Sequence, residues 1–212
     1  MQDTLTTILE SGVIAIIRSD APAGLARAGR ALSRGGIRAI EVTMTTPGAL
    51  DAVSELSEQS GDEFIVGAGS VLDSETARAA ILAGAEFLVM PALDADAIRT
   101  AKRYGKVVVP GALTPTEVIT AWEKGADMVK VFPASLGGPR YIKALKGPLP
   151  QVRLVPVGGV SPDNAGDYIR AGACAVALGS SLVNSRLIAE EAWDEISGRA
   201  GRCVEAVAEA RS

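Results

Sequence analysis

The sequence predicts a closed (β/α)8 barrel, a TIM barrel, with an N-terminal helix, and residues 1–212 are expected to form one domain of this kind. Short apolar stretches recur along the whole chain without polar alternation, as in parallel strands that are covered on both faces. Segments with helical patterning separate these stretches, so that strand and helix alternate. A chain of 212 residues, 48% of them hydrophobic, is ordinary in size for one such barrel.

The expected strands are short apolar stretches, most of them rich in β-branched residues. There are eight: VIAIIR (13–18), AIEVTM (39–44), FIVGAGSV (64–71), EFLVMPA (86–92), KVVVPGA (106–112), DMVKVFP (127–133), VRLVPVGGV (152–160) and ACAVALGSS (173–181). Because a helical segment follows each strand, right-handed crossovers would place them side by side in a closed barrel. An open doubly wound sheet is the alternative, but no G-x-G-x-x-G turn follows the first strand to favour it.

The helical segments carry signals for where helices begin and end. Three of them open with an N-cap residue followed by proline in the first turn: Thr46-Pro47, Thr114-Pro115 and Ser161-Pro162. Glu117 completes a capping box at the second of these, and a glycine that can end a helix precedes several strands. The first residues, MQDTLTTILESG, are expected to form a short capped helix. The last segment, 184–211, is long enough for two helices, broken near Ser197-Gly198.

The composition excludes several classes of function. A formal net charge of −4 and the lack of a basic patch argue against nucleic acid or an anionic membrane surface as a partner. With two cysteines, no signal peptide and no apolar run long enough to span a bilayer, the chain is expected in the cytoplasm. The sequence contains no histidine, which excludes Ser-His or Cys-His catalysis and histidine-based metal sites. Catalysis would therefore use Lys, Glu, Asp, Tyr, Cys, Arg or backbone groups.

Lys130 stands in the middle of an apolar strand, where an ammonium group is costly to bury. If its side chain points to the barrel axis, desolvation lowers its pKa and gives a neutral amine. Such an amine can attack a carbonyl and form a Schiff base. The alternative is a lysine whose stem packs while its ammonium group reaches the barrel mouth, with no chemical role.

Glu41 is a carboxylate inside the second expected strand. Facing Lys130 across the barrel, it would act as the acid/base partner that moves protons during imine formation and at the carbon next to the imine. The alternative is a structural ion pair with Lys130 or Arg18. Lys130 and Glu41 together favour a catalytic role more strongly than either residue does alone.

Barrel active sites lie at the C-terminal ends of the strands, so polar residues near those ends are candidates for substrate binding. Two glycine-rich turns follow the seventh and eighth strands, and their backbone N–H groups suit a phosphate, although tight turns also need glycine. Ser70 and Thr45 offer hydroxyl groups after the third and second strands, and Ser70 suits a carboxylate. Arg18 supplies a cation for the carboxylate or the phosphate, or else caps the first strand as a surface residue. The phosphate-binding candidates are Gly158, Gly159, Gly179 and Ser180.

Five segments, spread over nearly the whole chain, carry a family resemblance. In order, they are IEVTMTTPGA, VGAGSVL, VKVFPA, VPVGGVSPDN and LGSSLV. They resemble the aldolases that cleave 2-keto-3-deoxy-6-phosphogluconate and 4-hydroxy-2-oxoglutarate. The resemblance implies a class I aldolase that needs neither a metal nor a cofactor, a phosphorylated 2-keto acid as substrate, and a homotrimer. It also implies that Lys130 forms the Schiff base, that Glu41 is the acid/base group, and that Pro91 and Phe132 line the site with Arg18 and Ser70.

Two positions depart from the phosphogluconate pattern. Thr45 stands where many such members have an arginine that binds the carboxylate. Val157 stands where many have a threonine, and the valine is more similar to the phosphogalactonate-type enzymes. These positions leave open whether the preferred substrate has the gluconate or galactonate configuration. The alternatives to an aldolase are a phosphosugar isomerase or epimerase on the same barrel, with Glu41 as base, and a non-catalytic phosphate-binding barrel.

Overall fold

The computed structural model describes residues 4–20 and 23–212, in which strands and helices alternate along the chain. The strands are β1 (Val13–Ile17), β2 (Ala39–Thr43), β3 (Ile65–Gly69), β4 (Phe87–Val89), β5 (Val107–Val109), β6 (Gly111–Ala112), β7 (Val129–Val131), β8 (Leu154–Pro156) and β9 (Val176–Leu178). The helices are α1 (Thr4–Ser11), α2 (Leu25–Arg34), α3 (Ala49–Ser60), α4 (Ser74–Leu82), α5 (Ala95–Arg103), α6 (Pro115–Glu123), the 3-10 helix η1 (Ala134–Leu136), α7 (Gly138–Lys146), α8 (Ala165–Arg170), α9 (Ser185–Ala189) and α10 (Trp193–Arg211).

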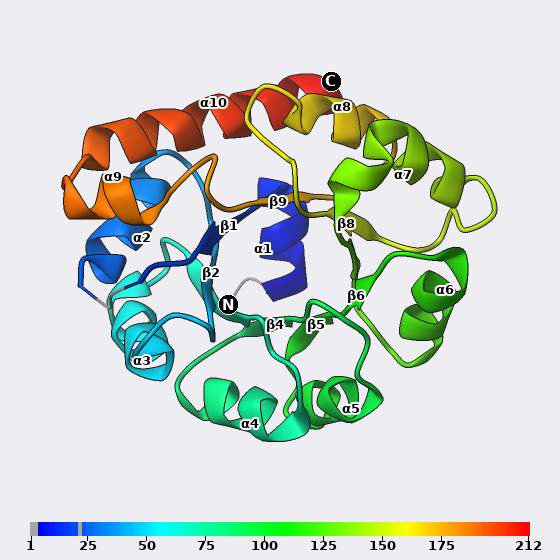
Figure 1. Cartoon of the computed structure of the whole chain (residues 1–212), viewed down its shortest axis with the longest axis horizontal. Coiled ribbons are helices and arrows are strands. Elements are labelled where there is room, and N and C mark those ends of the chain that lie inside the picture. Colours follow the sequence, from blue (N-terminus) through cyan, green and yellow to red (C-terminus); the bar gives the residue numbers. More distant parts are fainter. Residues whose placement is uncertain (1–3, 21–22) are drawn as a thin grey trace.

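The strands form a parallel α/β architecture, as the apolar pattern predicts. A six-stranded sheet has the order β5-β4-β3-β2-β1-β9, and a three-stranded sheet has the order β6-β7-β8. The strands curl around a central axis and the helices surround them, with α10 lying against α8 and α2 (Figure 1). Each of the eight expected ranges contains a strand, but the fifth is divided into β5 and β6. Pro110 separates these two strands and has no N–H group to continue a ladder.

The signals for helix ends are confirmed in part. Thr114 and Glu117 form the expected capping box, but α3 and α8 begin later than their Thr-Pro and Ser-Pro pairs, after Gly48 and Asn164. The Thr46 hydroxyl instead accepts a hydrogen bond from the backbone N–H of Ser19, at 3.3 Å. The glycines that precede strands adopt the left-handed conformation expected of helix ends, at positions Gly36, Gly84, Gly105, Gly125 and Gly172.

The chain ends also differ from the expected pattern in detail. The first three residues of the expected N-terminal helix lie outside the described residues, and the helix is present from Thr4 to Ser11. The prediction of a helix break near Ser197-Gly198 is wrong, because α10 runs through these residues without interruption. The interruption lies instead between α9 and α10, where Glu191 has a positive φ of 51°. Among the described residues, no helix is both long enough and apolar enough to cross a membrane.

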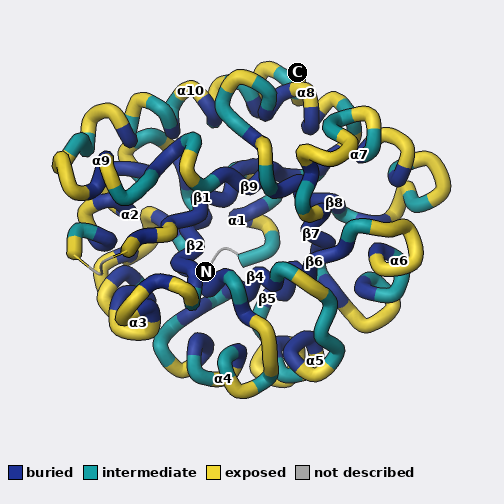
Figure 2. The backbone as a smooth tube through the Cα atoms, viewed as in Figure 1, coloured by how far each residue is buried: buried dark blue, intermediate teal, exposed yellow. Residues whose placement is uncertain are grey.

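Two hydrophobic layers result from the alternation of side chains along each strand. On β1, Val13, Ala15 and Ile17 pack toward the helices, whereas Ile14 and Ile16 pack toward the central axis. The strands at the centre are accordingly buried and the outer faces of the helices are exposed (Figure 2). The central layer also takes in a fully buried residue of α1, Ile8, together with residues near the start of several strands. Helix α1 therefore covers the end of the fold at which the strands begin, which leaves the C-terminal ends of the strands for a site.

Candidate active site

Lys130 and Glu41 both face the interior enclosed by the strands. On β7, the neighbours Val129 and Val131 pack in the outer layer, so Lys130 between them points inward. The same alternation on β2 turns Glu41 inward. Both side chains are buried, with 6% of Lys130 and 1% of Glu41 exposed. The structure thus brings an amine and a carboxylate into an apolar interior from strands on different sheets.

The carboxyl group of Glu41 is poorly compensated. Its Oε2 atom is buried and accepts no hydrogen bond within the described part of the chain. Burial raises the pKa of Glu41 to about 7, against the opposing influence of the Lys130 and Arg18 cations. A carboxyl group with this pKa exchanges its proton near neutral pH, as a general acid/base must.

The amine of Lys130 is shifted in the complementary direction. Burial lowers the pKa of Lys130, the Arg18 cation lowers it further, and Glu41 opposes both. The Nζ atom lies 4.8 Å from the centre of the Phe132 ring. None of the ion pairs found among the described residues includes Lys130 or Glu41. A larger fraction of the neutral, nucleophilic amine is the chemical consequence.

Room for the Glu41 carboxyl group comes from a glycine on the neighbouring strand. A Cβ atom on Gly69 would overlap this carboxyl group, and a Cβ atom on Gly67 would overlap the Phe87 ring. The structure shows that both glycines lie within β3 and leave space inside the fold.

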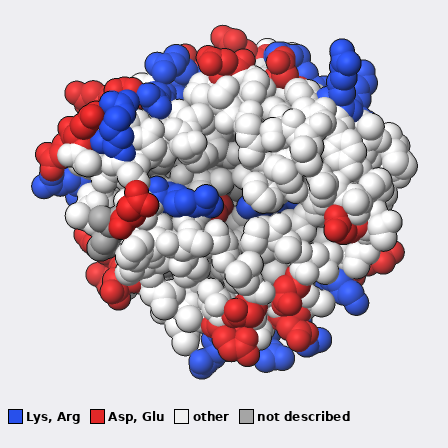
Figure 3. Space-filling model, viewed as in Figure 1, with Lys and Arg blue, Asp and Glu red and all other residues white. Residues whose placement is uncertain are grey.

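A cavity of about 620 Å³ opens at the C-terminal ends of the strands. The predicted binding residues that line it are Arg18, Phe132, Gly158, Gly159, Gly179 and Ser180. The viewed face of the molecule is hollowed at its centre, with basic side chains on opposite sides of the hollow (Figure 3). Arg18 is exposed, and in the part of the chain that the structure describes no hydrogen bond or ion pair occupies its guanidinium group. An anion in this cavity would therefore meet an available cation.

The two glycine-rich turns supply hydrogen-bond donors to the same cavity. Gly158 and Gly159 have φ values of 88° and 78°, a conformation that favours glycine. Within the described residues, the backbone N–H groups of Gly158, Gly159, Ser180 and Ser181 donate to no other protein group. Unpartnered N–H groups on adjacent turns suit the oxygens of a phosphate.

Three predicted binding residues lie apart from this cavity. Thr45 and Ser70 line a second cavity of about 580 Å³, beside α3 and α4, and Pro91 lines neither of the two. The Thr45 hydroxyl lies 3.1 Å from that of Thr43. Ser70 has a φ of 58°, which is uncommon for a residue other than glycine and occurs often at functional sites.

Some residues of the first cavity escaped the sequence analysis. They are Ile16, Asp20, Val160, Ser161, Val183, Asn184 and Ser185, whereas Val157, which the sequence singles out for the substrate configuration, also lines the cavity. A signal was available for Asp20, because it follows Arg18 at the end of the first strand. In the described ranges, no three His, Cys, Asp or Glu side chains gather in a way that could hold a metal ion.

The chain matches a family model described as KDPG and KHG aldolase, over residues 5–198. The 2-dehydro-3-deoxy-6-phosphogalactonate aldolase of Escherichia coli K12 is 39% identical over 80% of this chain and 83% of its own length. The 2-dehydro-3-deoxy-phosphogluconate aldolase of Pseudomonas aeruginosa is 32% identical over 97% of this chain and 94% of its own length.

A solved structure extends the likeness to three dimensions. It is a KDPG aldolase from Legionella pneumophila with pyruvate captured at low pH as a covalent carbinolamine intermediate. It superposes with a TM-score of 0.85 at 27% identity, and the match covers 93% of this chain and 96% of that one. The sequence resemblance is thereby confirmed. This chain belongs to the KDPG and KHG aldolase family, and it is an aldehyde-lyase.

Proposed function

We propose that the chain is a class I aldolase that cleaves a 2-keto-3-deoxy-6-phosphosugar acid to pyruvate and glyceraldehyde 3-phosphate. The observation that carries this proposal is the buried Lys130 amine, whose pKa is lowered, in one interior with the Glu41 carboxyl group. Cleavage of 4-hydroxy-2-oxoglutarate to pyruvate and glyoxylate is a second reaction open to the same chemistry. Family membership favours the lyase over the isomerase and the non-catalytic barrel.

Lys130 begins the reaction by attacking the C2 carbonyl of the substrate. The resulting carbinolamine loses water and becomes a protonated imine, which is an electron sink. Glu41 takes the proton of the C4 hydroxyl, the C3–C4 bond breaks, and its electron pair moves to the imine to form an enamine. Protonation at C3 and addition of water then release pyruvate and restore the Lys130 amine.

The surroundings of this pair fit the two anionic groups of the substrate. The N–H groups of Gly158, Gly159, Gly179 and Ser180, with the Arg18 cation, would bind the phosphate in the larger cavity. Ser70 and Thr45 would meet the carboxylate end, and Pro91 and Phe132 would line the path between. Ser70 and Thr45 belong to a separate cavity in this structure, so binding of the carboxylate there needs a substrate that reaches both cavities.

Val157 is the position at which the configuration of the substrate is best tested. It lines the larger cavity and is 5% exposed. Its apolar side chain offers no hydroxyl to a polar group of the substrate, whereas the threonine of many phosphogluconate-type members does. Comparing kcat/KM for the gluconate-type and galactonate-type substrates, in wild type and in Val157→Thr, would assign the preference.

We infer that the two sheets join into one closed (β/α)8 barrel that comprises residues 1–212 as a single domain. Near the start of β7, the N–H of Asp127 donates to the carbonyl of Val108 in β5 at 3.1 Å, which links the two sheets. An isolated parallel bridge, Val157 to Ala177, supports closure between the ends of β8 and β9. A homotrimer in the cytoplasm completes the proposal, and sedimentation of the purified protein tests the assembly.

The experiment that tests the reaction is borohydride reduction in the presence of pyruvate, followed by mass mapping of peptides. We expect a reduced pyruvyl adduct on Lys130 and none in Lys130→Ala. That variant should also lose activity by a factor on the order of 10⁵, the scale on which removal of a covalent nucleophile acts. No adduct on any lysine of the wild type, or full turnover by Lys130→Ala, would refute the Schiff-base mechanism.

A further inference from the structure

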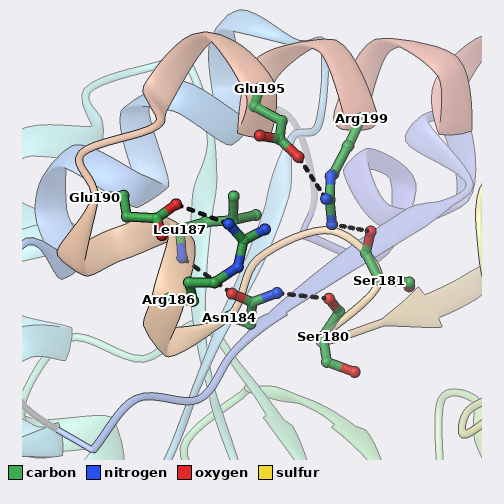
Figure 4. Close-up of polar contacts among 8 residues, drawn as sticks. All are labelled: Ser180, Ser181, Asn184, Arg186, Leu187, Glu190, Glu195 and Arg199. Atoms are coloured by element: carbon green, nitrogen blue, oxygen red, sulfur yellow. Dashed lines mark hydrogen bonds and ion pairs between the residues drawn. The ribbon is translucent and has the colours of Figure 1, made fainter.

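The turn between β9 and α9 is held by two side chains that the proposed mechanism does not use. The amide Nδ2 of Asn184 donates to the carbonyl of Ser180 at 3.4 Å, and Nη1 of Arg199 donates to the carbonyl of Ser181 at 3.3 Å. Figure 4 shows Asn184 at the start of α9 and Arg199 on α10, reaching the turn from separate helices. We call Ser180 and Ser181 the serine turn.

The hydrogen bonds on these carbonyls determine where the N–H groups of the serine turn point. In a trans peptide the C=O and N–H groups of one plane point in opposite directions. The Ser180 carbonyl is held by Asn184, so the Ser181 N–H in the same plane points away from Asn184. The Gly179 carbonyl accepts from the N–H groups of Leu182 and Val183 at 2.8 and 3.0 Å, so the Ser180 N–H points away from them.

Arg199 acts at the start of this chain of hydrogen bonds. It binds the Ser181 carbonyl, whose peptide carries the Leu182 N–H that donates to Gly179. The peptide of Gly179 in turn carries the unpartnered Ser180 N–H. Hydrogen bonds in series polarise one another, so a cation on the first carbonyl makes the last N–H a better donor.

The Arg199 side chain is fixed on a second side as well. It is only 22% exposed, and its guanidinium group pairs with Glu195 at 2.5 Å. Because Glu195 offsets the charge of Arg199, the side chain acts on the serine turn through its hydrogen bond to the Ser181 carbonyl.

We propose that Arg199 and Asn184 are positioning residues for anion binding: they hold the serine turn so that the Ser180 and Ser181 N–H groups face the substrate phosphate. This inference rests on the proposed function for the identity of the anion as a substrate phosphate. Neither side chain needs to touch the reacting atoms. A C-terminal helix thereby contributes to recognition at the opposite end of the substrate from Lys130.

The chain contains a matched control for Arg199. Arg186 forms an i,i+4 ion pair with Glu190 at 2.8 Å, as Arg199 does with Glu195. Its described contacts include no carbonyl of the serine turn. Arg186→Gln therefore removes a comparable ion pair without releasing the turn. For Asn184, serine is the matched replacement, because it keeps an acceptor for the Leu187 N–H at the start of α9 while the amide donor is lost.

The test measures the affinity of the purified protein for inorganic phosphate by titration calorimetry, in parallel with borohydride trapping of pyruvate. We expect Arg199→Gln and Asn184→Ser to weaken phosphate binding about 10-fold, the effect of losing an aligned hydrogen bond to an anion. Arg199→Lys should recover part of the loss, and Arg186→Gln should match the wild type. All four variants should trap pyruvate on Lys130 as the wild type does.

The two readouts separate the failure of this inference from the failure of the proposed function. Equal phosphate affinity in the wild type, Arg199→Gln and Asn184→Ser would overturn the inference even if pyruvate is trapped. A loss of pyruvate trapping that parallels the loss of phosphate binding would also overturn it, because the effect would then be structural. Absence of pyruvate trapping in the wild type would refute the aldolase and leave the phosphate measurement as a separate result.

Discussion

The interior around Lys130 and the mouth around the serine turn use opposite arrangements of polar groups. In the interior, an amine and a carboxyl group are buried without hydrogen-bonded partners among the described residues, and their pKa values move toward neutrality. At the mouth, each carbonyl of the serine turn is bonded, so that the N–H groups remain available. We therefore expect reactivity in this fold to come from groups left without partners, and recognition to come from groups whose partners are fixed.

This difference has an energetic consequence. A buried polar atom without a hydrogen bond destabilises the folded state by about 1–3 kcal/mol, and a buried charge by more. The interior therefore concentrates destabilising groups, whereas the mouth is stabilised by the bonds that orient it. Substitutions in the interior should change the chemistry strongly, and substitutions that release the serine turn should change the binding of phosphate alone.

The largest effect that distinguishes the two regions is expected from Glu41→Gln. Loss of a general acid/base group typically lowers kcat by about 10²–10⁴-fold. In the wild type, exchange of the methyl protons of pyruvate for deuterium should increase as the pH rises through about 7, because Glu41 must be ionised to accept a proton. Proton NMR in D₂O measures this exchange. We expect Glu41→Gln to exchange the methyl protons more slowly than the wild type and to lack the rise in exchange rate near pH 7.

The control for Glu41→Gln is adduct formation at long reaction times, because the loss of Glu41 slows the proton transfers of imine formation but leaves the Lys130 nucleophile in place. The variant should still be reduced by borohydride in the presence of pyruvate, because removal of the carboxylate lets the pKa of Lys130 fall further. An exchange rate in Glu41→Gln equal to that of the wild type would contradict the role of Glu41 as base.

A smaller effect is expected from Gly69→Ala, because it displaces the Glu41 carboxyl group without removing it. A displacement of about 1 Å can lower a rate by about 10²-fold. Gly67→Ala is the matched control, since its added methyl group meets the Phe87 ring and not Glu41. Both variants should lose about 1–3 kcal/mol of stability through overpacking, measured by urea unfolding. Only Gly69→Ala should slow proton exchange, and equal rates in the two would contradict a positioning role for Gly69.

The residues of the interior were predictable because each one interrupts an apolar strand. Lys130 lies between Val129 and Val131, and Glu41 lies between Ile40 and Val42, so a polar residue in an inward register stands out. The parallel α/β architecture followed from the same apolar runs. The glycine turns were predictable from their position after late strands, and the structure brings them to one cavity. The roles of these residues stay predictions.

Other features depend on contacts between segments far apart in the sequence. The role of Gly69 was not predictable, because nothing local in the sequence shows that the Glu41 carboxyl group occupies the space beside it. Arg199 follows Glu195 by four residues, a spacing that is ordinary on the exposed face of a helix. Thr45 and Ser70 lie at the ends of neighbouring strands, yet their side chains line a different cavity from Arg18. Strand order is readable from sequence, but the direction of a side chain beyond the strand end is not.

The smallest effect tests Arg18, a cation that influences both regions. Arg18 lines the larger cavity, where we propose that phosphate binds, and also lowers the pKa of Glu41. Arg18→Gln should weaken binding of inorganic phosphate about 10-fold, because one charge-assisted contact is lost. It should also move the rise of pyruvate proton exchange to higher pH, since the pKa of Glu41 is no longer lowered by this cation. Arg27→Gln is the control, because Arg27 is exposed and pairs with Glu191 outside the cavity. If the phosphate affinity falls while the exchange profile stays in place, Arg18 acts on the mouth alone and the two regions are electrostatically independent.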